Sequence, residues 1–455
     1  MESKNTSIAV LGAGLASLSL GYQLCKKGTQ ILLIEKNKFV GGLAKSIEKD
    51  GFIFDLGGHR FHAKNETILK EIKDLLGEDL LICERKSKIL LNGKFIDYPL
   101  QPLSAIFSFG IWKSVNFLTS YLYSAFRANS KNLPEESFES WIIKRFGYAL
   151  YKIYFKPYTE KVWGISPKQI SKDWATERID LINLGDAFKK ILFKSKNPPK
   201  TYLRQFYYPK KGIGMITNRM AKAIMGKGNQ ILTNWKVSEI RHKSSRIESV
   251  LIRNAQECIE IKSDQFVSTI PITELVSMLR PVVPTFISKT VSNLQYKATI
   301  CVFLIINKKK ITDDTWLYFP EKNIIFSRIN EPKNWSKECV PNKYKSSLCC
   351  QIFCNQNDET WKAEDKKIVS KCVFALSTIG FLNEDEIEDY FVERVPYAYP
   401  IYKIGYSSHL KIINDFLSQF KNLHLLGRTG TFSYLNMDRT IEMGFKKAQE
   451  LFHDR

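Results

Sequence analysis

The chain has 455 residues, and its 68 Lys and Arg outnumber its 46 Asp and Glu, which gives a formal net charge of +22. It is 44% hydrophobic and 25% charged, a composition typical of a soluble globular protein with two or three packed subdomains. The start, MESKNTS, lacks the features of a signal peptide, and the nine cysteines have no paired spacing. We therefore expect a cytoplasmic protein with free thiols and no metal site. No nucleic-acid-binding motif accompanies the positive charge, so we expect no nucleic-acid partner.

The segment from Ser7 to Gly42 predicts a βαβ unit that binds a dinucleotide. An apolar strand precedes Gly12-Ala13-Gly14, a helical pattern follows, and a second apolar strand ends at Glu35. Gly12 permits a tight turn, and Gly14 lets backbone amides approach a pyrophosphate at the helix N-terminus. Ser17 stands in the third glycine position. Glu35 follows at about 20 residues, where a carboxylate can accept hydrogen bonds from the ribose hydroxyls of adenosine. A glycine-rich turn in another kind of α/β unit is the alternative.

Two double glycines indicate which dinucleotide is bound. Gly41-Gly42 follows the acidic residue, and Gly57-Gly58 lies in GFIFDLGGHRFH. These turns resemble the large FAD family that includes amine oxidases, protoporphyrinogen oxidase and UDP-galactopyranose mutase, and GRTGTFSYLNMDRTIEMG (427–444) resembles its terminal motif. The resemblance implies FAD as the cofactor. It implies a cofactor site made of Gly12, Gly14, Leu15, Ala16, Glu35, Lys36, Gly41, Gly42, Leu43, Gly57, Gly58, His59, Gly427, Arg428 and Asp438, with Asp438 capping the last helix.

The order of the predicted elements indicates an α/β fold with a discontinuous Rossmann-type domain. Apolar runs at 266–271, 299–307 and 346–355 predict strands, and a closing helix is expected from about Asp438. We assign residues 1–98, 206–275 and 396–455 to the FAD-binding domain. An inserted helical substrate domain takes 99–205, and an antiparallel-sheet substrate domain takes 276–395.

One stretch in the helical region is nearly apolar. It runs from Leu103 to Phe126 and is interrupted by Lys113 and by several Ser, Asn and Thr residues. Its length approaches that of a membrane span, but its polar interruptions argue against a transmembrane helix. We expect a buried helix pair here. The alternative is a helix that makes peripheral contact with a membrane, since its aromatic residues suit an interface.

Three further segments resemble parts of UDP-galactopyranose mutase that bind substrate. Residues 155–179 carry Tyr158 and Trp163, which the resemblance assigns to the base or sugar, and Arg178, which it assigns to the diphosphate. Arg328, within 319–336, would be the second essential arginine. A guanidinium binds phosphate oxygens bidentately and stays charged, which agrees with both arginine assignments. The alternatives are a core role for Trp163 and surface positions for the two arginines.

Tyrosines and one histidine complete the candidate site. Tyr397, Tyr399 and Tyr402 surround Pro400. By resemblance they flank the flavin and touch phosphates, with Tyr399 in the catalytic group and the other two in the substrate-binding group. His59 resembles a flexible histidine beside the flavin and is a catalytic candidate together with Arg178 and Arg328. An aromatic face that packs in the core, and a structural hydrogen bond for His59, are the alternatives.

The resemblance implies a flavin-dependent mutase that interconverts the pyranose and furanose forms of a nucleotide sugar, in surface polysaccharide biosynthesis. It would need reduced FAD, which attacks the anomeric carbon through N5 and expels the nucleoside diphosphate, with no net redox change. The alternative is an FAD-dependent oxidoreductase of the amine oxidase or protoporphyrinogen oxidase type, in which substrate gives hydride to FAD. A third possibility is a non-catalytic flavoprotein subunit. The residues leave the sugar and the oligomeric state open.

Overall fold

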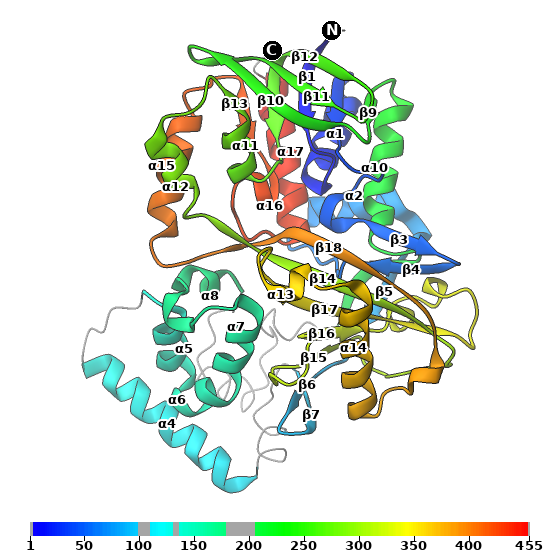
Figure 1. The fold of residues 1–455 in the computed structure, drawn as a ribbon, viewed down its shortest axis with the longest axis vertical. Helices are drawn as coiled ribbons and strands as arrows, with labels where there is room; N and C mark the ends of the chain where they lie inside the picture. The colour runs from blue at the N-terminus through cyan, green and yellow to red at the C-terminus, as the bar shows by residue number, and fades with distance from the viewer. Residues whose placement is uncertain (1–2, 99–109, 131–135, 179–204, 454–455) are drawn as a thin grey trace.

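The computed structural model describes residues 3–98, 110–130, 136–178 and 205–453 (Figure 1). One sheet with its helices lies beside the two termini, a second sheet lies below it, and a helical lobe flanks the second sheet. Parallel and antiparallel pairing both occur, as the α/β prediction requires.

The first sheet is the nucleotide-binding sheet of the prediction. Its order is β13-β10-β11-β12-β1-β2-β9, and β19 also pairs with β12. β1 pairs in parallel with both β2 and β12, so that Ala9 lies opposite Leu32 on one side and Phe266 on the other. The residues of β1 from Ile8 to Leu11 are fully buried, as expected for a parallel sheet covered on both faces. The strands are β1 (Ser3–Leu11), β2 (Ile31–Ile34), β9 (Gln230–Leu232), β10 (Lys236–Lys243), β11 (Arg246–Arg253), β12 (Cys258–Ser268), β13 (Leu279–Arg280) and β19 (Leu423–Leu425).

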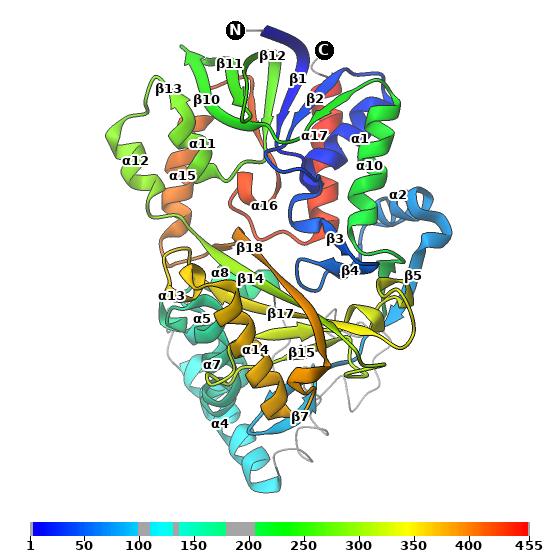
Figure 2. The same ribbon diagram turned by 45° about the vertical axis from the view of Figure 1, so that its right-hand side comes forward.

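Helices cover both faces of this sheet. α1 (Leu15–Lys26), α10 (Gly214–Gly226) and α17 (Met437–His453) lie on one side (Figure 2). Gly444 lets α17 approach α1, because a Cβ at this position would lie 2.8 Å from the carbonyl oxygen of Ala16. α11 (Ile272–Met278), α12 (Thr285–Val291) and α15 (Tyr406–Leu417) pack their apolar residues on the other side.

The second sheet has the order β18-β14-β17-β16-β15-β6-β7. β14, which pairs with both β18 and β17, is buried from Tyr296 to Ile306, and α14 (Asp365–Ile379) packs against one face of the sheet. The strands are β6 (Ser87–Leu91), β7 (Lys94–Asp97), β14 (Gln295–Ile306), β15 (Trp316–Tyr318), β16 (Arg328–Asn330), β17 (Ser346–Cys354) and β18 (Ile387–Ile401).

Three boundaries of this sheet differ from the expected domain limits. β18 continues to Ile401, so residues 396–401 belong to the second sheet and not to the FAD-binding domain. β6 and β7 join the second sheet through parallel pairing of β6 with β15, so residues 87–97 do not belong to the first sheet. Residues 279–291, by contrast, pack with the first sheet through β13 and α12. All three differences depend on contacts between segments distant in sequence, which local patterns do not reveal.

Two short antiparallel pairs lie outside both large sheets. β3 (Ser46–Lys49) pairs with β4 (Phe52–Asp55), and β5 (Leu80–Glu84) pairs with β8 (Gln205–Pro209). The remaining short helices include α2 (Glu66–Leu76), α13 (Glu359–Lys362) and α16 (Gly427–Gly430).

The helical lobe contains α4 (Ile111–Ser130), α5 (Phe138–Phe146), α6 (Tyr148–Leu150), α7 (Lys156–Trp163) and α8 (Lys172–Arg178), with a π-helical turn at Tyr151–Phe155. Its core is aromatic and includes Phe138, Trp141, Tyr151 and Trp163. α4 lies on the outside of the lobe (Figure 1).

The expectation of a buried helix pair at Leu103–Phe126 is wrong for the part that the structure describes. Residues 103–109 lie outside the described residues, and the rest belongs to the single helix α4. Trp112 and Phe126 are 85% and 76% exposed, because only one edge of α4 packs on α5 and α6. Among the helices of the described ranges, none is long and apolar enough to cross a membrane. Peripheral membrane contact stays a prediction.

Candidate functional site

The turn after β1 requires glycine at the expected positions. Gly12 has φ +104°, and a Cβ there would lie 2.3 Å from Oγ1 of Thr269. Gly42 has φ +56°, and its Cβ would lie 3.1 Å from the Cα of Gly14. Side chains at these positions would therefore strain the backbone and close the space between the two turns.

The N-terminus of α1 is arranged for an anion. Gly14 is the N-cap residue, and no side chain caps the helix. The first-turn N–H groups are therefore available to a phosphate, and the helix dipole favours negative charge there. Ser17, which replaces the third glycine, is fully buried and shares a hydrogen bond of 3.0 Å with Oγ1 of Thr269.

Glu35 is buried at the end of β2 and is held by three hydrogen bonds. Its Oε2 accepts the backbone N–H of Ala13 at 2.9 Å, and its Oε1 accepts the N–H of Asn37 at 3.0 Å and the side-chain amide of Asn37 at 2.7 Å. The carboxylate therefore fixes the glycine turn while its remaining lone pairs face the cavity that it lines.

A cavity of about 410 Å³ runs from this turn towards β18. Such a volume lies within the usual range for small-molecule and cofactor sites. Among the predicted cofactor residues, those that line it are Gly12, Gly14, Leu15, Ala16, Glu35, Lys36, Gly41, Gly42, Leu43, His59, Gly427 and Arg428. The open glycine cradle, the uncapped helix N-terminus and the buried acid fit the pyrophosphate and ribose of FAD.

Three predicted cofactor residues do not line this cavity. A Cβ on Gly57 would meet the side chain of Gln351 at 3.0 Å, and one on Gly58 would meet the indole of Trp316 at 2.8 Å. These glycines let their loop pack on the second sheet. Asp438 is the second residue of α17 and is not its N-cap residue. Its negative charge lies in the first turn, where it interacts favourably with the helix dipole.

His59 faces the cavity in a neutral form. Its Nδ1 donates to the carbonyl oxygen of Gly57 at 3.2 Å, which leaves Nε2 as an acceptor. Burial, with a further contribution from the positive charge of Arg428, lowers the pKa of His59 to about 4. Arg428 donates to the carbonyl oxygens of Leu435 and Ala398, each at 3.1 Å, and lies over the ring of Tyr399.

Asp55 anchors the loop that carries His59. Its carboxylate accepts hydrogen bonds from the hydroxyl of Tyr208 at 2.7 Å, from the hydroxyl of Ser46 and from the N–H of Ile213 at 3.1 Å. Burial raises the pKa of Asp55 to about 6, although these hydrogen bonds act in the opposite direction.

Arg328 lies in a second, aromatic part of the site. Its Nε donates to the hydroxyl of Tyr158 at 2.9 Å, and its guanidinium lies 4.9 Å from the ring centre of Phe353 and 5.8 Å from that of Tyr318. Burial alone would lower the pKa of Arg328, but Tyr158 and other nearby tyrosines raise it above its ordinary value, so the group stays charged. We name this set (Tyr158, Trp316, Tyr318, Arg328 and Phe353) the arginine chamber.

Lys161 links α7, which carries Tyr158, to the chain segment just before Arg328. Its ammonium donates to the carbonyl oxygens of Phe319, Glu321 and Phe326, at 2.6, 2.8 and 2.7 Å. Lys161 lies one helical turn after Tyr158, and Phe326 lies two residues before Arg328. Burial lowers the pKa of Lys161 to about 7.

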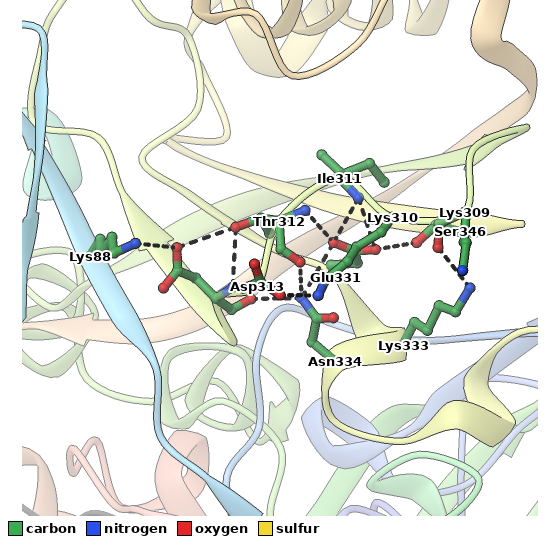
Figure 3. Close-up of polar contacts among 11 residues, drawn as sticks. Lys88, Lys309, Lys310, Ile311, Thr312, Asp313, Glu331, Lys333, Asn334 and Ser346 are labelled. Carbon is green, nitrogen blue, oxygen red and sulfur yellow. Dashed lines mark hydrogen bonds and ion pairs between the residues drawn. The ribbon is translucent and has the colours of Figure 1, made fainter. Parts of the chain in front are cut away.

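A buried acid supports the strand of Arg328 from its other end. Figure 3 shows Glu331, just after β16, accepting from the N–H groups of Ile311 and Thr312 and from the hydroxyl of Ser346. Nearby, Lys333 donates to the carbonyl oxygens of Lys309, Lys343 and Lys345. These contacts attach β16 to the loop before β15 and to β17.

The three tyrosines predicted around Pro400 lie in different surroundings. Tyr397 lines the cavity and donates to Glu274 at 2.8 Å. Tyr399 stacks on Tyr434 with ring centres 5.4 Å apart. Tyr402 stacks on Tyr406 and is only 3% exposed, which gives it a core position.

Two further predicted residues lie in the helical lobe: Trp163, from the substrate-binding group, and Arg178, from the catalytic group. Trp163 is 3% exposed and lies edge-on to Tyr399 with ring centres 6.4 Å apart. Its indole nitrogen has no hydrogen-bond partner among the described residues. Arg178 is the last residue of α8, and its side chain lies outside the described part of the structure.

Several residues of the site were not predicted from the sequence, namely Asp55, Lys161, Gln351 and Glu331. Asp55 and Glu331 carried a usable signal, because each is an acid inside or beside an apolar strand, in FIFD and RINEP. Buried acids are rare unless they are hydrogen-bonded, so both merited attention. Lys161 and Gln351 carried no such local signal.

Comparison with known proteins agrees with this architecture. The family of flavin containing amine oxidoreductases matches residues 15–452. UDP-galactopyranose mutase of Mycoplasma genitalium is 21% identical over 454 residues, which cover 98% of this chain and 94% of that protein. Chloroplastic protoporphyrinogen oxidase 1 of Spinacia oleracea is 21% identical over 325 residues, 67% of this chain and 57% of that protein, so the chain spans less than two thirds of this relative.

A crystal structure of reduced UDP-galactopyranose mutase has the same fold, with a TM-score of 0.84 at 21% identity, covering 99% of this chain and 94% of that chain. The family match extends over almost the whole chain; it begins at Leu15, directly after Gly12 and Gly14, and includes Gly41 and Gly42. On this evidence the chain belongs to the flavin containing amine oxidoreductases, and its cofactor is FAD.

Proposed function

We propose that this flavoprotein is a nucleotide-sugar mutase that interconverts pyranose and furanose forms. The observation that carries the proposal is Arg328, a permanently charged guanidinium that is 9% exposed and surrounded by aromatic rings. Among the described residues it makes no ion pair with a carboxylate, so its charge suits an anionic ligand. The likeness to two UDP-galactopyranose mutases over nearly the full chain also supports this choice.

The residues of the site have separate roles in this proposal. Reduced FAD supplies a nucleophile for covalent catalysis when bound. Arg328 binds the diphosphate and stabilises the charge that develops when the bond from the anomeric carbon to the diphosphate oxygen breaks. Tyr158 orients Arg328, and Tyr399 contacts the diphosphate beside Arg428. The same bond re-forms after the sugar ring has closed on its other hydroxyl, so no electrons are gained or lost.

His59 contributes an acceptor beside the cofactor. With Nδ1–H bound to Gly57, its neutral Nε2 can hold a hydroxyl proton of the sugar or a flavin N–H. Trp163 offers to the nucleotide its indole N–H, which has no hydrogen-bond partner in the part of the chain that the structure describes. We place Arg178 at the diphosphate as a second cation, and Tyr397 and Tyr402 on the substrate side, on the strength of the family resemblance.

An FAD-dependent oxidoreductase is the second candidate, and the family match itself favours it. In that reaction a carbon–hydrogen bond of the substrate breaks and its hydride passes to FAD. Oxygen or another acceptor then reoxidises the reduced flavin. This activity has no need for a buried arginine, and it predicts that substrate bleaches the flavin.

Turnover of purified protein on a panel of nucleotide sugars separates the two candidates. We expect anaerobic, dithionite-reduced protein to interconvert pyranose and furanose forms, and oxidised protein to be inactive. Isomerisation that is independent of reduction would contradict the mutase proposal, as would a lack of isomerisation with any sugar. Flavin bleaching by an amine or a porphyrinogen would establish the oxidoreductase instead.

A further inference from the structure

Helix α4 turns large apolar side chains to solvent. Trp112 and Phe126, near its two ends, are 85% and 76% exposed, and four apolar residues between them are also exposed. Five of the six follow one another at intervals of three or four residues, so they lie on one face of the helix. The six residues, which we call the α4 apolar face, are Trp112, Val115, Leu118, Leu122, Tyr123 and Phe126.

The other side of α4 packs on the lobe through small residues. Ser124 is buried, and the hydroxyl of Ser120 accepts a hydrogen bond from the N–H of Ala149 at 3.0 Å. Gly147 approaches so closely that a Cβ there would lie 2.7 Å from the backbone nitrogen of Tyr121. These contacts fix the rotation of α4 about its axis, so the α4 apolar face cannot turn inward without breaking them.

A contiguous apolar face of this kind indicates a docking surface. Single exposed apolar residues are normal on a protein, whereas a group of them marks contact with a membrane or with another protein. Thr119 lies among the six, but its hydroxyl donates to the carbonyl oxygen of Val115 at 3.1 Å and is satisfied within the helix. Figures 1 and 2 show α4 at the end of the molecule opposite the two termini, where an extended surface can approach it.

The charge of the chain favours an anionic lipid surface as the partner. Residues 98–134, which include α4, contain no Asp or Glu, whereas Lys113, Arg127 and Lys131 occur in this stretch. Basic residues close in sequence to an apolar helix face favour anionic head groups, and Trp and Tyr suit the boundary between head groups and acyl chains. The net charge of +22 acts in the same direction and opposes contact between two copies of this chain.

We propose that α4 docks the protein on the surface of a bilayer that contains acidic phospholipids, with the α4 apolar face in the head-group region. The helix lies in the plane of the membrane and does not cross it, because its other side stays packed on the lobe. Docking needs neither substrate nor reduced flavin. It therefore goes beyond the proposed function, and its test is independent of that function.

Sedimentation of the FAD-loaded protein with lipid vesicles tests this surface. We compare vesicles of phosphatidylcholine alone with vesicles that hold equal parts of phosphatidylcholine and phosphatidylserine. We expect binding to the mixed vesicles, much weaker binding to phosphatidylcholine alone, and a fall in affinity at high salt, because salt screens the attraction between charges. Equal binding to both kinds of vesicle would contradict the proposed preference for acidic lipid.

A double variant, Trp112→Ser with Phe126→Ser, tests the α4 apolar face itself. Each substitution removes a large apolar side chain from the interface, which should weaken binding about tenfold, so we expect a loss of about 100-fold in affinity for the mixed vesicles. FAD content and melting temperature should match those of the wild type, because both side chains are exposed. Wild-type affinity in the double variant would show that net charge alone holds the protein on the vesicles, and would overturn the inference.

Phe374→Ser is the matched control, because Phe374 is 74% exposed and lies on α14 of the second sheet. It removes the same kind of side chain as Phe126→Ser and should leave the vesicle affinity unchanged. A loss as large as that of the double variant would mean that any exposed apolar residue contributes equally, which also overturns a specific role for α4.

Analytical ultracentrifugation without vesicles distinguishes a membrane from a second copy of the chain. We expect the wild type and the double variant to have the same mass in solution, since the positive charge of each copy opposes contact through α4. A wild-type dimer that dissociates in the double variant would assign the α4 apolar face to contact between copies, and membrane docking would then be wrong.

Discussion

Nε of Arg328 lies 2.9 Å from the hydroxyl oxygen of Tyr158, although the two residues belong to different units, β16 of the second sheet and α7 of the helical lobe. The tyrosine accepts this hydrogen bond, and burial, partly offset by the positive charge of Arg328, raises its pKa to about 12. The guanidinium is therefore oriented by a neutral partner, which leaves its charge for a ligand.

Tyr158→Phe tests this orientation. The ring and its packing are kept, but Arg328 loses the acceptor for its Nε. We expect the affinity for uridine diphosphate to fall about tenfold, since a hydrogen bond to a charged group contributes about 1.5–3 kcal/mol. Titration of the FAD-loaded protein measures it. Tyr148→Phe, at a residue that is 54% exposed, is the control and should have no effect. Equal affinities in all three proteins would remove Tyr158 from the site.

Glu35→Gln tests the cofactor assignment. Glu35 accepts the N–H of Ala13 with one oxygen and two donors of Asn37 with the other. Glutamine has only one carbonyl oxygen, so one of these groups meets an amide N–H instead. We expect FAD to dissociate at least about ten times faster, which dilution followed by flavin fluorescence measures.

Glu48→Gln serves as the control, because Glu48 is an exposed acid on β3. FAD binding as tight in Glu35→Gln as in Glu48→Gln would show that the buried carboxylate does not support the cofactor.

Asp55→Asn should change how stability depends on pH. The folded-state pKa of Asp55, about 6, lies above its ordinary 3.8. The folded protein therefore holds the proton more tightly than the unfolded chain. The resulting stabilisation is fully present below about pH 4 and is lost as pH rises through 6, by up to about 3 kcal/mol. We expect denaturant midpoints of the wild type to fall between pH 4 and 7 relative to those of Asp55→Asn. Parallel pH profiles for the two proteins would contradict this.

The sequence predicted those parts of the site that depend on local geometry. The spacing of Gly12, Gly14 and Glu35 defines a βαβ unit by itself, and the structure brings all three to one cavity. Gly57 and Gly58 were also identified as special, but their neighbours are Gln351 and Trp316 from distant strands, which no local pattern could indicate.

The exposure of α4 was missed for a related reason. Apolar residues such as Trp112 and Phe126 give the same local signal whether or not another segment covers them. Family resemblance predicted Arg328 as a catalytic residue and Tyr158 as a substrate-binding residue. Their direct hydrogen bond depends on how the helical lobe docks on the second sheet, which only the structure reveals.

We expect Lys161→Met to destabilise the protein at the arginine chamber and to change how the free energy of unfolding depends on pH. The substitution leaves the carbonyl oxygens of Phe319, Glu321 and Phe326 without their shared donor, and we expect a loss of about 2–4 kcal/mol in the free energy of unfolding.

The folded-state pKa of Lys161, about 7, lies below its ordinary 10.5, so between these values the unfolded chain holds more protons. The stability of the wild type relative to the variant should therefore rise from pH 7 to 10.5. Denaturant midpoints at pH 7 and 9 measure this, with Lys152→Met, at an exposed lysine of the same lobe, as the control. A stability difference that stays constant across these pH values would mean that Lys161 keeps its ordinary pKa, and that the three carbonyl groups hold it as a fully charged ammonium throughout.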